Sequence, residues 1–397
     1  MQQLFEKSVQ KVMRIERHFK RSLSDEIDWS SRLIGIKGAR GAGKTTLMLQ
    51  YMRENLPMNE QSLYVSLDAA WFMNHSLTDL MDDFVKAGGR FLFLDEVHKY
   101  PGWSGALKNA WDDYPDLKIV FSGSSLLEIL NARADLSRRA ITYTLPGLSF
   151  REYIALSAGH TFPAYPLEEI IEHHIAIAAE INAVLRPLPL FRNYLRDGFY
   201  PFFRESPQTY LWRLEEVLNY VLEVELPLLR GLEISYVAKI KQLMQIIAES
   251  VPFTPNVTEL SSRIGINRNT LVSYFHYLEE ANIINNLYKD AKGLTKMQKP
   301  AKILMENTNI MHALAPHKVN KGAGRETFFV NQLKAAHLVE YANIGDFRVD
   351  GTYLFEVGGK NKTPAQLKGA ARSQVAADDI ETGYGRIIPL WLFGFLR

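Results

Sequence analysis

Short apolar runs alternate with amphipathic stretches over the first 150 residues. The apolar runs have the length of buried strands and lie at 33–36, 62–67, 91–94, 117–121 and 141–145. The stretches between them, such as 46–52, have helical character. Strands that alternate with helices predict an α/β domain with a doubly wound parallel sheet, to which we assign residues 1–150.

After this domain the hydrophobic pattern becomes that of helices. Residues 151–235 are expected to be mainly helical, with breaks at Pro187, Pro189 and Pro201. We interpret this region as a helical lid or adaptor beside the first domain.

Residues 236–307 predict a compact set of short elements. Three helices are expected, at 236–251, at 258–264 and from 267 onward. Two strands follow, at 283–288 and at 303–306. Thr258 is the expected N-cap of the second helix. Leu271, Phe275 and Leu278 share one face of the third helix. This order predicts a winged helix-turn-helix.

The third helix of this set carries side chains that suit a DNA groove, which are Arg268, Asn269, Thr270, Ser273 and Tyr274. The loop between the two strands is rich in lysine and would contact phosphate through Lys289, Lys292, Lys296 and Lys299. The alternative is a winged helix that packs against protein. The lysines favour DNA as the partner.

Residues 38–45 read GARGAGKT, which matches the phosphate-binding pattern G-x-x-x-x-G-K-[ST]. The pattern lies between an expected strand and an expected helix, so that a helix N-terminus points at the anion. Lys44 can reach the β- and γ-phosphates of ATP, and the Thr45 hydroxyl can hold Mg²⁺. The residues expected to bind ATP or ADP are Gly38, Ala39, Arg40, Gly41, Ala42, Gly43, Lys44, Thr45 and Thr46.

A second motif follows the apolar run at 91–94, where Asp95 and Glu96 come directly after the expected strand. Asp95 is expected to orient Mg²⁺ together with Thr45, and Glu96 to polarise the water that attacks the γ-phosphate. The run at 117–121 ends in serines, of which Ser122 or Ser124 can sense the nucleotide. Their alternative role is to cap a helix over 126–131.

Three arginines, Arg133, Arg138 and Arg139, lie between the last two expected strands. One of them is a candidate arginine finger that completes the site of a neighbouring subunit. Arg139 is the first choice and Arg138 the second. The alternative is an ordinary solvated helix face. A finger that acts between subunits predicts a homo-oligomer.

Composition narrows the classes of function. The net charge is +2, so contact with nucleic acid must depend on a local patch. There is no cysteine, which excludes disulfides and thiolate metal sites and suits a reducing cytoplasm. We find no secretory signal at the N-terminus and no apolar run of about 18 residues, so a cytoplasmic protein without a membrane span is expected.

Taken together, these motifs resemble one family, the prokaryotic predicted ATPases of the AAA+ superfamily that carry a C-terminal domain of unknown function. The segments that carry the resemblance are GARGAGKTTLMLQ, FLFLDEVHKYPGW, IVFSGSSLLEI, LSRRAITYTLPGLSFREYI and FEVGGKNK. The resemblance implies an AAA+-type P-loop ATPase. The family usually has a Gly-Arg pair where this chain has Arg138-Arg139, which implies Arg139 as the finger.

The last region, 308–397, resembles a restriction-endonuclease-like α/β domain. Asp350 and Glu356 would be metal ligands on a hairpin, with Glu326 from the preceding helix. A nuclease needs lysine two residues after the second carboxylate, where this chain has Gly358, and Lys360 lies roughly 7 Å further along an extended strand. A degenerate nuclease fold used for binding or assembly is therefore favoured over DNA cleavage.

The fold expected from these patterns is an α/β chain of four parts. A P-loop AAA+-type ATPase domain is followed by a helical lid, a winged helix and a restriction-endonuclease-like domain. The favoured function is ATP hydrolysis, with ATP and Mg²⁺ as cofactors, coupled to DNA binding or remodelling. The alternative is a nucleotide-gated switch that binds another protein and no DNA.

Overall fold

The structure is a computed structural model that describes residues 1–397 except 124–135, 228–232, 250–253, 290–298, 368–369 and 371. The chain divides into two compact units, Met1–Gly147 and Leu148–Arg397. The three parts expected after residue 150 fall within the second unit. No helix among the described residues is both long enough and apolar enough to cross a membrane.

The first unit is an α/β domain with five strands, which are β1 (Leu33–Lys37), β2 (Ser62–Ser66), β3 (Phe91–Asp95), β4 (Lys118–Gly123) and β5 (Ile141–Thr144). All paired neighbours run parallel, in the order β2-β3-β4-β1-β5. Each of the five strands expected from the apolar runs is therefore confirmed. Placing β4 between β1 and β3 brings the carboxyl ends of these three strands together.

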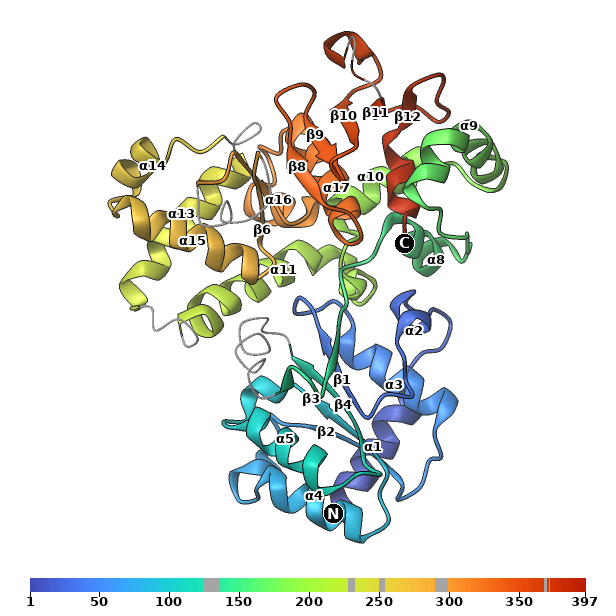
Figure 1. Cartoon of the computed structure of the whole chain (residues 1–397), viewed down its shortest axis with the longest axis vertical. Helices are drawn as coiled ribbons and strands as arrows, with labels where there is room; N and C mark the ends of the chain where they lie inside the picture. The colour runs from blue at the N-terminus through green and yellow to red at the C-terminus, as the bar shows by residue number, and fades with distance from the viewer. Residues whose placement is uncertain (124–135, 228–232, 250–253, 290–298, 368–369, 371) are drawn as a thin grey trace. The chain divides into compact units, whose positions relative to one another are not determined.

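Helices cover both faces of this sheet (Figure 1). The described helices are α1 (Gln2–Arg14), α2 (Leu23–Glu26), α3 (Lys44–Asn55), α4 (Leu77–Lys86) and α5 (Trp103–Asp113). Side chains of α4 and α5 pack in one core with Leu92 and Leu94, whereas side chains of α3 pack in another core with Phe93. Successive residues of β3 thus point to opposite faces and are buried on both, as a parallel sheet requires.

The second unit begins with helices, as expected for residues 151–235. They are α8 (Phe150–Ala158), α9 (Leu167–Val184), α10 (Pro187–Asp197) and α11 (Tyr210–Tyr220), with a π-helical turn at Val221–Glu225. Next come α13 (Ile234–Glu249), α14 (Val257–Ile264) and α15 (Arg268–Glu280), and then the antiparallel pair β6 (Ile284–Leu287) and β7 (Lys302–Met305). The helices and strands expected over 236–307 are confirmed as elements.

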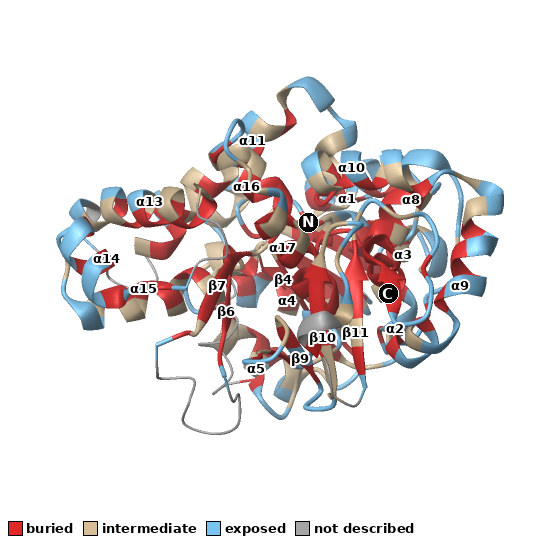
Figure 2. Ribbon diagram, turned by 90° about the horizontal axis from the view of Figure 1, so that it is seen from above, coloured by how far each residue is buried: buried red, intermediate tan, exposed pale blue. Residues whose placement is uncertain are grey.

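The rest of the second unit is a sheet with two further helices, α16 (Thr308–Leu314) and α17 (Lys321–Lys334). The sheet has the order β12-β11-β10-β9-β8 and is formed by β8 (Val339–Tyr341), β9 (Phe347–Val349), β10 (Tyr353–Gly358), β11 (Ser373–Ala377) and β12 (Ile387–Pro389). β8, β9 and β10 pair antiparallel, whereas β10, β11 and β12 pair parallel. Strands β10 and β11 are largely buried, and exposed residues line helices such as α9 and α14 (Figure 2).

Candidate functional site

The phosphate-binding loop connects the end of β1 to the start of α3, as the sequence predicts. Gly41 and Gly43 have φ angles of 83° and 97°, in the left-handed region that favours glycine. Gly38 is needed for another reason, because a Cβ built there would lie 2.2 Å from the carbonyl oxygen of Leu145. The glycines of the motif therefore serve both the turn and a close approach of two chain segments.

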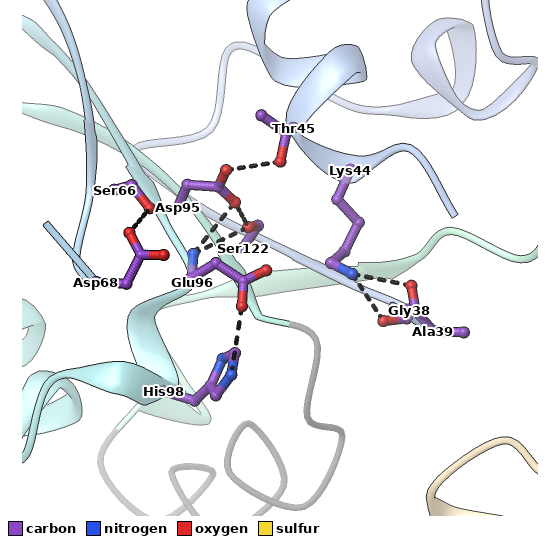
Figure 3. Close-up of polar contacts among 10 residues, drawn as sticks. All are labelled: Gly38, Ala39, Lys44, Thr45, Ser66, Asp68, Asp95, Glu96, His98 and Ser122. Carbon is purple, nitrogen blue, oxygen red and sulfur yellow. Dashed lines mark hydrogen bonds and ion pairs between the residues drawn. The ribbon is translucent and has the colours of Figure 1, made fainter. Parts of the chain in front are cut away.

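Lys44 lies inside this loop and is only 5% exposed. Its Nζ donates to the carbonyl oxygens of Gly38 at 2.9 Å and Ala39 at 3.0 Å (Figure 3). Gly43 provides no side-chain cap for α3. Backbone N–H groups at such a helix start suit an anion, so the loop combines one ammonium group with several amide donors.

Arg21 is buried and contacts the backbone of the phosphate-binding loop. Its guanidinium donates to the carbonyl oxygen of Ala42 in the loop, at 2.6 Å. It also donates to the carbonyl oxygens of Pro146, at 2.7 Å, and Gly147, at 3.1 Å. One side chain thus ties the phosphate loop to the last residues of the first unit.

Asp95 ends β3 directly beside the loop and is 3% exposed. Its Oδ2 accepts hydrogen bonds from Thr45 Oγ1 at 2.6 Å and from Tyr64 Oη at 2.7 Å. Its Oδ1 accepts from Ser122 Oγ and from the backbone N–H of Glu96, the latter at 3.1 Å (Figure 3). A threonine hydroxyl and a carboxylate in contact form a set of hard oxygen ligands that fits Mg²⁺.

Glu96 follows Asp95 and has an unusual backbone for a residue with a side chain. Its φ and ψ are 54° and 43°, in the left-handed region, which costs about 1–2 kcal/mol relative to the right-handed helical conformation. The bond from its N–H to Asp95 helps to hold this conformation. Its Oε2 lies 3.4 Å from His98 Nε2 (Figure 3). The Glu96 carboxylate, which is expected to polarise water, thus lies next to the His98 imidazole.

From the sequence alone His98 is interpreted as a structural histidine, although it stands only two residues after Glu96. Its side chain is 5% exposed. Burial, together with the charges of Lys99, Lys44 and Arg40, lowers the pKa of His98 to about 4. The imidazole is therefore neutral near pH 7 and can donate a hydrogen bond to the Glu96 carboxylate without adding charge.

Ser122 lies at the end of β4, fully buried, with its hydroxyl turned toward Asp95 and within 3.4 Å of the N–H of Glu96. A position between these two carboxylate residues suits the sensing role expected for it. Ser124 and the helix expected over 126–131 lie outside the described residues.

The candidate finger arginines differ in their contacts. Arg139 Nε and Nη2 donate to the two carboxylate oxygens of Asp112, at 3.1 and 3.0 Å. Arg138 is exposed and forms no ion pair with any residue that the structure describes. Arg133 lies outside the described residues. The finger assignment stays a prediction.

The two helices of the region predicted as a helix-turn-helix both have asparagine N-caps. Asn256 Oδ1 accepts from Glu259 N and caps α14, so the expectation of Thr258 as N-cap is wrong, because the helix begins at Val257. Asn267 Oδ1 accepts from Thr270 N at 2.8 Å and caps α15.

The face of α15 differs from expectation at one residue. Tyr274 is 1% exposed and packs inside, so its expected place at a DNA groove is wrong. Leu271, Phe275 and Leu278 are buried as expected. An open hollow of about 730 Å³ is lined by the polar side chains of Asn267, Arg268, Asn269, Thr270 and Ser273 and by the buried Ser261. Lys292 and Lys296 lie outside the described residues.

The carboxylates of the C-terminal sheet do not form the expected hairpin site. Asp350 lies in the turn between β9 and β10, where it accepts hydrogen bonds from Leu338 N at 2.8 Å and, at 2.7 Å, contacts His337 Nδ1. Glu356 is buried and pairs with Lys362 Nζ at 2.6 Å. The carboxylate of Asp346 accepts instead from the N–H of Val357, the residue that follows Glu356.

Glu326 points to a different partner, since its carboxylate pairs with Lys302 Nζ at 2.5 Å. The expectation that Asp350 and Glu356 share a metal with Glu326 is therefore wrong. Among the described residues, no three His, Cys, Asp or Glu side chains form a metal-binding group.

Comparison with protein families finds two matches in this chain. Residues 30–154 match the family described as an AAA domain. Residues 188–321 match a family described as a domain of unknown function (DUF8612). Residues 30–154 are therefore similar to an AAA domain, and the parallel sheet and the phosphate loop of the first unit agree with this match. A comparison with curated proteins found no match.

Several solved structures match this chain at low similarity. A Walker-type ATPase of Pyrococcus abyssi is 12% identical, with a TM-score of 0.42 over 75% of this chain and 95% of that one. AMPPCP-bound DnaA from Aquifex aeolicus is 13% identical, with a TM-score of 0.26 over 65% and 84%. The S. cerevisiae Hsp104–ADP complex is 18% identical, with a TM-score of 0.28 over 70% and 39%. These scores are low, so the assignment of the ATPase domain rests on the family match and the site.

The pKa of His98 predicts how stability depends on pH. Unfolded histidine has a pKa near 6.5, whereas the pKa of His98 in the folded protein is about 4. Acidification from pH 6.5 to 4 protonates the unfolded state first, so the free energy of unfolding falls as the pH falls. We expect His98→Gln to lose less stability over this range than the parent protein, as measured by urea unfolding at several pH values.

His173→Gln is the matched control, because the His173 side chain is 65% exposed. Other buried histidines also contribute to the pH dependence of the free energy of unfolding in the parent protein. The difference in this pH dependence between the parent and His98→Gln isolates the contribution of His98. The same loss of stability in His98→Gln as in the parent would contradict the prediction.

Proposed function

We propose that the chain is a Mg²⁺-dependent ATP hydrolase that couples its nucleotide state to DNA binding or remodelling. The observation that carries the hydrolase part is the contact of Asp95 with Thr45 of the phosphate loop, at 2.6 Å, with Glu96 next to it. An ATPase needs these three groups together. The match to an AAA domain supports the same assignment.

Each residue has a role in this proposal. Lys44 leaves the carbonyl oxygens of Gly38 and Ala39 and turns to the β- and γ-phosphates of ATP. Thr45 and Asp95 would hold Mg²⁺, which when bound neutralises charge on the phosphate oxygens. Glu96 orients and polarises the attacking water. Residues 38–46 bind the phosphates through their backbone N–H groups.

The contacts of Glu96 support this role. A carboxylate that is already held in position needs little reorganisation during the reaction. The left-handed backbone of Glu96 and its contact with His98 hold the side chain within the first unit. Ser122, which contacts both Asp95 and the N–H of Glu96, would respond to a change at either residue.

Glu96→Gln tests the hydrolytic role. The amide keeps the size of the side chain but cannot polarise water as a carboxylate does, so we expect turnover to fall about a hundredfold or more. Binding of a fluorescent ATP analogue is expected to stay within about twofold. Phosphate release at saturating ATP and Mg²⁺ measures the first quantity. Glu60→Gln, at an exposed glutamate, is the control, and unchanged turnover in Glu96→Gln would refute the role.

We also propose that the chain forms a homo-oligomer in which Arg139 or Arg138 reaches the site of a neighbouring copy. Arg138 is exposed. Arg139 is held by Asp112 and would exchange this carboxylate for a phosphate. A guanidinium suits both partners because its donors match two oxygens at once.

Mixing two inactive variants tests this arrangement. An Arg139→Ala subunit keeps Glu96, and a Glu96→Gln subunit keeps Arg139, so a mixture contains some complete sites. We expect phosphate release by the mixture to exceed the sum of the two separate variants. The same test with Arg138→Ala shows which arginine acts.

Asp112→Ala is the control, since it breaks the ion pair with Arg139 but leaves the arginine in place. A finger role predicts that this variant stays active. No recovery in either mixture would exclude a finger that acts between subunits.

The DNA part of the proposal is carried by the start of α15, whose polar side chains line the hollow of about 730 Å³. Arg268 and Asn269 are exposed there. In a winged helix-turn-helix, the residues at the start of the recognition helix contact the groove. Lys292 and Lys296 remain proposed phosphate contacts.

Arg268→Ala tests DNA binding. We expect weaker binding of duplex DNA in a mobility-shift assay and, if Arg268 contacts phosphate, a salt dependence reduced by about one ion. Arg192→Ala, at an exposed arginine of α10, is the control. Titrations with and without ATP show whether nucleotide controls binding. No binding at low salt in either state would contradict the DNA role and favour the protein-interaction switch.

A further inference from the structure

One tyrosine hydroxyl is buried within the apolar core of the first unit. Tyr64 is the middle residue of β2 and is 4% exposed. It pairs with Phe93 of β3 and packs in the core formed by side chains of α3 and the central strands. A phenylalanine would fill this place as well, so the hydroxyl needs its own explanation.

The Tyr64 hydroxyl points at the metal-orienting carboxylate. Its Oη donates to Asp95 Oδ2 at 2.7 Å. A tyrosine hydroxyl is protonated near neutral pH, so it acts as a hydrogen-bond donor toward the Asp95 carboxylate.

Two hydroxyl groups share Asp95 Oδ2, from Tyr64 and from Thr45. Thr45 is expected to turn its hydroxyl oxygen to Mg²⁺ when nucleotide binds. Tyr64 would then be the one side-chain donor that the described residues leave on Oδ2, while Ser122 remains on Oδ1. A carboxylate held on both oxygens keeps its plane when the metal arrives, as outer-shell donors do for metal ligands.

Two residues of helix α1 contact Tyr64. The Tyr64 N–H donates to Ser8 Oγ at 2.9 Å, and Ser8 is buried. Lys11 Nζ lies 4.8 Å from the centre of the Tyr64 ring. Residues 2–14 of α1 precede the match to the AAA domain, which begins at residue 30. This contact therefore links a segment outside the matched domain to the nucleotide site.

We propose that Tyr64 is a positioning residue that fixes the Asp95 carboxylate for Mg²⁺, and that α1 fixes Tyr64 through Ser8. The proposal rests on the proposed ATPase function. It adds outer-shell contacts to the site, from Ser8 of α1 to Tyr64 of β2 and from Tyr64 to Asp95 at the end of β3. The competing explanation is that Asp95 merely satisfies a buried hydroxyl, with no effect on the metal.

Tyr64→Phe separates these explanations because it removes one hydroxyl and leaves the ring packing in place. The affinity for fluorescent ADP is measured with EDTA and then over a Mg²⁺ titration. We expect the Mg²⁺-free affinity to stay within about twofold and the Mg²⁺ concentration for half-maximal effect to rise about tenfold or more. Hydrolysis at saturating Mg²⁺ is expected to recover most of its rate.

Two further variants sharpen the test. Tyr143→Phe removes a hydroxyl from β5 of the same sheet, where it accepts from Asp28 N, and is expected to leave the Mg²⁺ titration unchanged. Ser8→Ala removes the bond that holds the Tyr64 backbone and is expected to shift the titration in the same direction as Tyr64→Phe, by less. It also keeps the proposal testable if Tyr64→Phe fails to fold.

The outcomes distinguish this proposal from the function on which it rests. A parent protein that binds no nucleotide, or hydrolyses ATP without Mg²⁺, would refute the proposed function. A Mg²⁺-dependent parent whose Tyr64→Phe and Ser8→Ala variants titrate like it would overturn the role of Tyr64 alone. Lower thermal stability in Tyr64→Phe with an unchanged Mg²⁺ titration would likewise assign the hydroxyl to structure only.

Discussion

The hydrogen bonds to the carboxylate of Asp95 hold the candidate site together. They come from α3, from β2, from β4 and from the next residue of the chain, and they leave Asp95 nearly buried. A buried carboxylate is stable only when donors satisfy it, so the strand order and the loop must place all of these groups at one spot. The sheet order β2-β3-β4-β1-β5 does this, because β3 lies directly between β2 and β4.

Most of the first unit could be predicted from the sequence, for local reasons. Its strands are buried on both faces and therefore appear as short apolar runs, and the phosphate loop is a contiguous motif. Tyr64 and His98 could not be found in the same way. A tyrosine in an apolar strand looks like any core residue, and a histidine after a strand looks like any loop residue. Only the tertiary contacts with Asp95 and Glu96 set them apart.

The second unit shows where patterns mislead. Asp350 followed by Gly351 has the composition of a tight hairpin turn, and both residues have positive φ. Asp350 lies in that turn, and the N–H of Val357, the residue after Glu356, donates to the carboxylate of Asp346. Tyr274 lies three residues after Leu271, which places it on the buried face of α15, so helical spacing itself argued against exposure. In both places the position of a residue within its element decides its contacts more than its residue type does.

Arg21 gives the phosphate loop a mechanical connection. Its guanidinium joins Ala42 to Pro146 and Gly147, and Gly147 is the last residue before the chain enters the second unit. A rigid planar group that grips both segments transmits a shift of one to the other. A displacement of Ala42 would therefore reach the backbone of Pro146 and Gly147 through a single side chain.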